Sequence, residues 1–181
     1  MNILLKTIFI LIILMFPSTG NGYSNQAYNA FIKYDNLNIT RSFSYNGFNI
    51  KLYAKSSREL NWLNSKTIDV IDKISIFYES ESLSFCDKKP IEIYLMNQDT
   101  LNNKSIMPFL WLRKFPKGIN GIYTTSTSHD ENGSLFISNT PVRMTSTRVL
   151  VHEIVHYWQD MNCELYPSEA EAAKFEKFYF N

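Results

Sequence analysis

The sequence has almost no net charge, and it nowhere concentrates charge of one sign. Its 181 residues include 18 basic and 17 acidic side chains, which leave a formal net charge of +1 at pH 7. Lysines are scattered, as at Lys88, Lys114 and Lys117, and they form no basic stripe. Proteins that bind nucleic acid usually carry such a stripe. The charge pattern therefore predicts no nucleic-acid partner.

The sequence also lacks an apolar run long enough to cross a membrane. Its most apolar run, over residues 7–16, follows Lys6 and precedes small residues, whereas a spanning helix needs about 20 apolar residues. This layout is typical of a secretory signal peptide. We therefore expect a signal peptide over residues 1–22 and one exported domain, periplasmic or secreted, over residues 23–181. No membrane attachment is expected after cleavage.

Cysteine is scarce as well, because Cys86 and Cys163 are the two in the chain. An oxidising compartment favours a disulfide between two such residues. As metal ligands they would be redundant beside the histidines and carboxylates discussed below, and free thiols are the remaining alternative. The sequence therefore predicts a Cys86–Cys163 disulfide.

Histidine occurs three times, yet two of the three stand in the pattern His152-Glu153-Ile154-Val155-His156. Residues four apart on a helix lie about 40° apart around the axis, so both imidazoles project from one face. Two ring nitrogens can then reach one Zn²⁺ at about 2.0–2.1 Å each. Glu153 lies one step round the helix, where its carboxylate can accept a proton from water activated by zinc. The spacing predicts His152 and His156 as metal ligands and Glu153 as the catalytic base.

The residues around this pattern have helical periodicity. Two adjacent apolar rows recur at helical spacing, and they consist of Leu150, Ile154, Tyr157 and Met161 beside Val151, Val155 and Trp158. The histidines fall on the other side of the helical wheel, so they are not core fillers. Thr145, Ser146 or Thr147 offers an N-cap. A chance match or a decayed site is the alternative interpretation of the pattern.

The spacing of apolar residues along the rest of the chain predicts a single α+β domain. Alternation predicts strands over residues 39–45 and 48–54, joined by a hairpin turn at Asn46-Gly47. Helical spacing follows over residues 57–78. The remaining expected strands cover residues 28–34, 90–95, 119–126 and 134–138, and a last helix covers residues 169–179.

This order of elements resembles the minimal core of the zincin metallopeptidases, which has a long helix, a mixed sheet, a zinc-binding helix and a short ligand helix. The stretch over residues 169–175 is similar to the third-ligand helix of the gluzincins, where a Glu carries a small residue three positions later. The resemblance covers roughly residues 57–181, and its specific part is confined to residues 148–175. It implies that a Glu on the last helix is the third zinc ligand and that one coordination position remains for water.

Two glutamates compete for the role of third ligand. Glu171 stands three residues after Ser168, which fits a capping box at the start of the helix. Glu169 has Ala172 three residues later, which is the spacing of the gluzincin ligand helix. The two carboxylates point about 200° apart around the helix, so they are not expected to bind one metal together. We predict Glu169 as the ligand, with Glu171 as the alternative.

Two features depart from the gluzincin pattern. Ala173 stands where related proteins often carry an Asp that supports a ligand histidine, and Asp160 is the candidate replacement. Almost no chain remains for the downstream side chain that stabilises the oxyanion in larger relatives. The candidates for that role are Tyr123, Tyr157, Arg143 and Arg148.

The motif and the resemblance together predict an exported, zinc-dependent metallopeptidase, a hydrolase that acts on a peptide or protein. The strand over residues 134–138 is the expected edge for an extended peptide to pair with. The alternative is a non-enzymatic, exported binding module that keeps a zincin-like scaffold around a structural zinc. Glu153 favours the enzyme, because a structural site needs the ligands but not that carboxylate.

Overall fold

The computed structural model describes residues 34–78, 90–103, 120–124, 133–140, 143–162 and 168–181. The expected signal peptide, Cys86 and Cys163 lie outside these residues, so the expected disulfide stays a prediction. Within the described residues no helix is both long and apolar enough to span a membrane. Their helices and strands are, in chain order, β1 (Ile39–Tyr45), β2 (Phe48–Ala54), α3 (Ser57–Phe77), β3 (Ile91–Met96), α4 (Gln98–Leu101), β4 (Gly121–Thr124), β5 (Gly133–Ser138), α5 (Arg143–Met161) and α6 (Glu169–Phe180).

The five strands form one mixed sheet in the order β1-β2-β3-β5-β4. Strands β2, β3 and β5 are parallel, while β1 and β4 pair antiparallel with their neighbours. The expected α+β class is therefore confirmed. The expectation that residues 134–138 form an edge is wrong, because Leu135 of β5 lies between Ile93 of β3 and Tyr123 of β4. Among the strands that the structure describes, β4 forms the edge on this side of the sheet.

Local sequence explains the first hairpin and the long helix. Asn46 and Gly47 have positive φ angles of 46° and 83°, as a two-residue turn between right-twisted strands requires. Ser56 caps α3 by accepting a hydrogen bond from the Glu59 N–H at 3.3 Å. The predicted hairpin turn at Asn46-Gly47 and the predicted helix over residues 57–78 are both confirmed. The strand expected over residues 28–34 is wrong at Tyr34, its one described residue, which has helical backbone.

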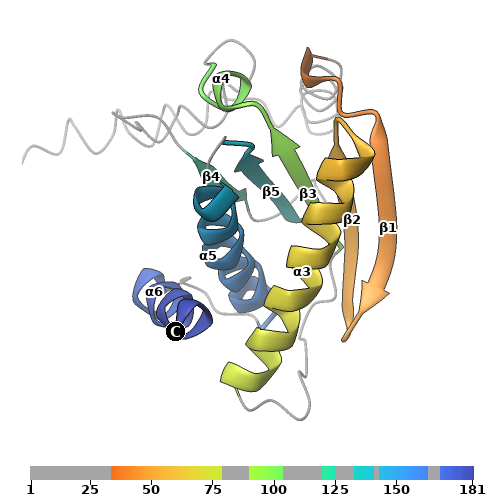
Figure 1. The fold of residues 1–181 in the computed structure, drawn as a ribbon. Helices are drawn as coiled ribbons and strands as arrows, with labels where there is room; N and C mark the ends of the chain where they lie inside the picture. The colour runs from red at the N-terminus through yellow and green to blue at the C-terminus, as the bar shows by residue number, and fades with distance from the viewer. Residues whose placement is uncertain (1–33, 79–89, 104–119, 125–132, 141–142, 163–167) are drawn as a thin grey trace, which may run out of the picture.

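Helices α3 and α5 lie on one face of the sheet, and α6 packs against α5 and α3 (Figure 1). The strands contribute alternate residues to this face, among them Leu52, Ile93 and Leu135, which are fully buried. The apolar rows of α5 cover them, as the periodicity predicts. Helix α6 contributes Ala172 and Phe175, both 0% exposed. The core therefore lies between the sheet and three helices.

The predicted N-cap of the motif helix is wrong, because α5 begins at Arg143 and Thr145, Ser146 and Thr147 lie inside it. Ser146 is buried, and its hydroxyl group donates a hydrogen bond to the Ser138 carbonyl oxygen at 2.7 Å. Its polar side chain thus ties the start of α5 to the end of β5. Sequence alone does not separate this tertiary use of a serine from a capping one.

Gly121 allows α5 to lie close to the edge strand. A Cβ atom at this position would stand 2.0 Å from Val149 Cγ1 and 2.9 Å from the Phe136 carbonyl oxygen. Helix α5 or strand β4 would have to move to accommodate it, because such distances are far below van der Waals contact. The position of β4 beside the motif helix therefore depends on glycine, which has no side chain, at position 121.

We expect Gly121→Ala to lower the free energy of unfolding by about 1–3 kcal/mol, the usual cost of forcing extra atoms into a packed site. Denaturant titration of the purified protein measures this loss. In a Val149→Ala background the same change should cost less, because the nearest clashing atom is gone. Equal losses in both backgrounds would contradict the close contact between Gly121 and Val149.

Candidate metal centre

The end of one helix and the start of another bring three metal-ligating side chains together. His152 and His156 project from α5, and Glu169 is the first residue of α6. The Nε2 atoms of the two histidines lie 3.2 Å apart. One Glu169 oxygen is 3.0 Å from His152 Nε2, and the other is 3.4 Å from His156 Nε2. Among the residues that the structure describes, these three form the group able to hold a metal ion.

The donor atoms lie close enough together to share one metal ion. Two donors that each stand about 2.0–2.1 Å from a tetrahedral Zn²⁺ are about 3.3 Å apart. The two histidine nitrogens, 3.2 Å apart, match this value, and the contacts of 3.0 and 3.4 Å to the histidines come from different oxygens of Glu169. Two imidazoles and one carboxylate are also a donor set that zinc commonly takes. The residues therefore fit the metal that the sequence predicts.

The competition between Glu169 and Glu171 has a clear geometric outcome. Glu169 reaches both histidines, whereas the Glu171 carboxylate accepts a hydrogen bond from Gln159 Nε2 at 2.9 Å. Ser168 is the N-cap of α6, as predicted, and its hydroxyl accepts from the Glu171 N–H at 3.3 Å. The second half of the capping box is absent, because the Ser168 N–H donates to Gln159 instead. Zinc ligation by Glu169 stays a prediction.

Gln159 is a site residue that the sequence analysis missed. Its side chain is fully buried, and its Oε1 lies 3.0 Å from His156 Nδ1. It follows His152 by seven residues and His156 by three, so all three share one stripe of α5. A search of that stripe for polar residues would have found it.

Glu176 is the second residue missed, and its carboxylate, not that of Asp160, lies near the outer nitrogen of His152. One Glu176 oxygen lies 3.7 Å from His152 Nδ1, and the other accepts from Arg148 Nε at 2.8 Å. The prediction for Asp160 is wrong, because its carboxylate accepts from the Tyr123 hydroxyl at 2.6 Å. Glu176 stands seven residues after Glu169, on the same face of α6.

Glu153 lies beside the cluster and is held by the edge strand. Its Oε2 accepts a hydrogen bond from the backbone N–H of Tyr123 on β4 at 2.8 Å. Burial raises the pKa of the Glu153 carboxyl, and this effect outweighs the positive field of His152 and the Tyr123 N–H, which both favour the ionised form. A carboxylate with a raised pKa accepts a proton more readily than an exposed one.

The residues considered for stabilising an oxyanion are engaged elsewhere. Tyr123 donates to Asp160, and Arg148 pairs with Glu176 and lies 5.4 Å from the centre of the Phe180 ring. Tyr157 is 1% exposed and belongs to the core. The side chain of Arg143 lies outside what the structure describes. The oxyanion role therefore has no supported candidate among Tyr123, Tyr157 and Arg148.

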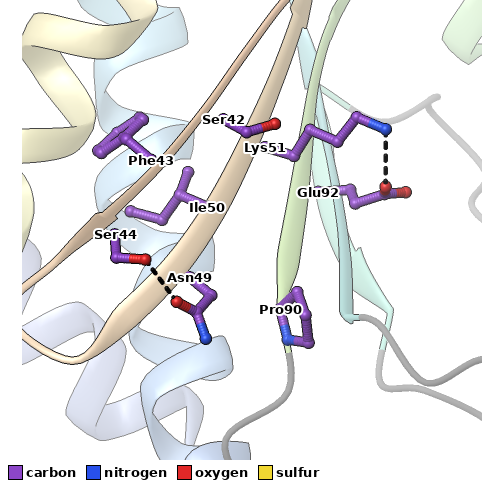
Figure 2. A pocket seen from close by; sticks show the side chains of 8 residues that line it. All are labelled: Ser42, Phe43, Ser44, Asn49, Ile50, Lys51, Pro90 and Glu92. Atoms are coloured by element: carbon purple, nitrogen blue, oxygen red, sulfur yellow. Dashed lines mark hydrogen bonds and ion pairs between the residues drawn. The ribbon is translucent and has the colours of Figure 1, made fainter.

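A groove on the opposite face of the sheet offers no comparable chemistry. It is lined by residues of β1, β2 and the start of β3, and Figure 2 shows two pairs among its polar side chains. Lys51 Nζ lies 3.8 Å from Glu92 Oε1, and the Ser44 hydroxyl donates to Asn49 Oδ1 at 2.7 Å. No member of the histidine cluster lines it. We therefore place the functional site at the cluster.

Comparison with known proteins identifies no relative: no family model, curated protein or solved structure matches the chain. The function of the cluster must therefore be inferred from its own side chains and from the helices and strands that hold them.

The Tyr123 hydroxyl is expected to stabilise the fold through Asp160. We predict that Tyr123→Phe lowers the free energy of unfolding by about 1.5–3 kcal/mol, the usual value of a hydrogen bond to a charged group. Denaturant unfolding of Tyr123→Phe, Asp160→Ala and the double variant tests the pairing. The double variant should lose less than the sum of the two single losses, because the singles remove the same bond. Strict additivity would contradict it.

Proposed function

We propose that this protein is a zinc-dependent peptidase whose metal is held by His152, His156 and Glu169. The observation that carries the proposal is the convergence of these three side chains from α5 and α6, close enough together to share one metal ion. Glu169 stands 13 residues after His156 and 17 after His152, and only the docking of α6 on α5 brings it to the two histidines. A chance sequence match does not account for that third donor.

The number of donors supports a catalytic zinc over a structural one. Structural zinc is almost always held by four protein ligands, whereas catalytic zinc has three and keeps a position for water or substrate. Three donors converge within the described part of the chain. Glu153 adds the base that a structural site does not need. The binding-module alternative therefore fits the cluster less well.

Each residue near the cluster has a chemical role in this proposal. Bound Zn²⁺ supplies Lewis acidity, which polarises a peptide carbonyl group and lowers the pKa of water. Glu153 takes up the proton of that water on its carboxylate and returns it to the departing amine. The Tyr123 N–H keeps the Glu153 side chain in place through its hydrogen bond to Oε2. Gln159 and Glu176 approach the outer nitrogens of the two histidines, as partners that orient metal ligands do.

The position of β4 supports a peptide substrate. β4 is an edge strand, and Tyr123 within it contacts Glu153. An extended peptide can add to such an edge through backbone groups other than the Tyr123 N–H, which Glu153 occupies. Pairing with β4 would bring a peptide bond next to Glu153 and the histidines. We propose β4, in place of the strand expected from the sequence, as the edge that receives the substrate.

The zincin resemblance and export belong to the same proposal. The order of α3, a mixed sheet, α5 and α6 agrees with a minimal zincin core. A secretory signal over residues 1–22 would place the peptidase outside the cytoplasm. Proteolysis by a small exported domain is the activity that these features jointly support.

The first test of this function is metal binding. Purified protein should hold about one Zn²⁺, and His152→Ala or His156→Ala should abolish stoichiometric binding, because each removes one ligand. Glu169→Gln should weaken binding strongly. Glu171→Gln should retain the metal, because the Glu171 carboxylate accepts a hydrogen bond from Gln159 and not from the histidines. Elemental analysis with chelator competition measures all four variants.

Two outcomes would contradict this assignment. Stoichiometric zinc in the His152→Ala/His156→Ala double variant would place the metal elsewhere in the protein. Loss of zinc in Glu171→Gln with retention in Glu169→Gln would transfer the ligand role to Glu171.

The second test concerns the base. Glu153→Gln should keep both the fold and the metal, while the rate of peptide hydrolysis falls by about 10²–10⁴-fold, because an amide cannot accept the proton. Cleavage of a broad peptide library, followed by mass spectrometry, compares the variant with the wild type. Equal rates would exclude Glu153 as the base. A wild type that binds zinc but cleaves nothing would support the binding-module alternative.

A further inference from the structure

Gln159 occupies a buried position where every hydrogen-bonding group of its amide has a partner. The side chain is 0% exposed. Its Oε1 lies 3.0 Å from His156 Nδ1 and accepts from the Ser168 N–H at 3.2 Å. Its Nε2 donates to a Glu171 carboxylate oxygen at 2.9 Å and to the Ser168 carbonyl oxygen at 3.4 Å. One amide thus connects the motif helix to the first turn of α6.

These partners determine which way the amide faces. The carbonyl oxygen of Ser168 and an ionised Glu171 carboxylate can only accept hydrogen bonds, so the amide NH₂ group must face them. The amide oxygen must then face the Ser168 N–H and His156 Nδ1. An oxygen without a proton pairs with a ring nitrogen only when that nitrogen carries one. The tautomer of His156 thus follows from the hydrogen-bond network around it.

We infer that Gln159 is a positioning residue that holds His156 in the tautomer with the proton on Nδ1 and the lone pair on Nε2. The same amide forms hydrogen bonds with both the backbone N–H and the backbone carbonyl oxygen of Ser168. Ser168 immediately precedes Glu169 in the chain. Gln159 therefore sets the tautomer of His156 and the location of Glu169.

The inferred tautomer has a consequence for the cluster, and this step rests on the proposed metal site. His156 Nε2 then presents a lone pair 3.4 Å from Glu169 Oε1, which also presents lone pairs when the carboxylate is ionised. The same nitrogen lies 3.2 Å from His152 Nε2, so its lone pair can accept a proton from His152 or meet a metal ion. The network around Gln159 thus leaves a lone pair on His156 Nε2 that is available to a metal ion.

Nuclear magnetic resonance can read the tautomer without any metal. Long-range ¹H–¹⁵N spectra of chelator-treated, ¹⁵N-labelled protein at about pH 8, above the usual imidazole pKa of about 6.5, distinguish a protonated ring nitrogen from an unprotonated one. The chain has three histidines, so His156→Gln identifies the signals of His156. We expect a protonated Nδ1 and an unprotonated Nε2. The opposite tautomer in the wild type would overturn the inference.

Substitutions of Gln159 and Glu171 test the role of Gln159. Gln159→Met removes the acceptor for the Nδ1 proton and should weaken zinc binding by about 10–100-fold, the usual effect of losing a partner that orients a metal ligand. The double variant Gln159→Glu/Glu171→Gln exchanges the carboxylate and the amide. Its carboxylate still accepts from His156 and the Ser168 N–H, and its new amide restores the bond between positions 159 and 171. The 3.4 Å bond to the Ser168 carbonyl oxygen is lost. We expect the double variant to recover the tautomer and part of the zinc affinity.

The outcomes separate this inference from the proposed function. Unchanged zinc affinity in folded Gln159→Met would overturn the positioning role, and so would a folded double variant that recovers neither property. If the wild type has the expected tautomer but binds no zinc, the proposed peptidase fails while the assignment of the His156 tautomer stands. Circular dichroism establishes that each variant is folded, and the spectra of the wild type decide the tautomer even if Gln159→Met does not fold.

Discussion

The docking of α6 on α5 is the interaction on which the rest of the site depends. Glu169 is 81% exposed at the first residue of α6, so its own contacts do not fix its position. Burial of Ala172 and Phe175 anchors the helix against α5 and α3. A buried Phe contributes about 1.5–3 kcal/mol, which is as much as a hydrogen bond to a charged group contributes. Apolar packing therefore holds the carboxylate beside the histidines.

Hydrogen bonds add the register that apolar packing alone does not specify. A net hydrogen bond is worth about 0.5–1.5 kcal/mol, but a buried polar group left without a partner costs about 1–3 kcal/mol. If α6 shifted along α5, the buried amide of Gln159 would lose both backbone groups of Ser168. The same reasoning applies at β4, where the Tyr123 N–H meets Glu153 and Gly121 gives α5 room to approach. Each polar contact selects one arrangement among those that the core would tolerate.

The candidate site was partly predictable from the sequence. The paired histidines and Glu153 follow from helical spacing, which is a local property of the chain. The choice of Glu169 follows from the resemblance to the gluzincin ligand helix. Gln159 and Glu176 were missed, because a partner of a ring nitrogen is defined by direction in space and not by a motif. Asp160 was assigned to a histidine although it binds Tyr123, a residue 37 positions away. Such pairings depend on how β4 approaches α5, which no local pattern records.

The sequence by itself determined most of the helices and strands and the class of the fold. Alternation of apolar residues produced the β1–β2 hairpin, period-3.6 spacing produced α3 and α5, and Ser168 marked the start of α6. Only the tertiary structure decided that β5 is interior, that β4 is the edge and that Ser146 bonds to β5. It also decided which glutamate meets the histidines. The physical reason is that periodicity depends on neighbours in the chain, whereas strand order and side-chain partners depend on which apolar faces bury each other.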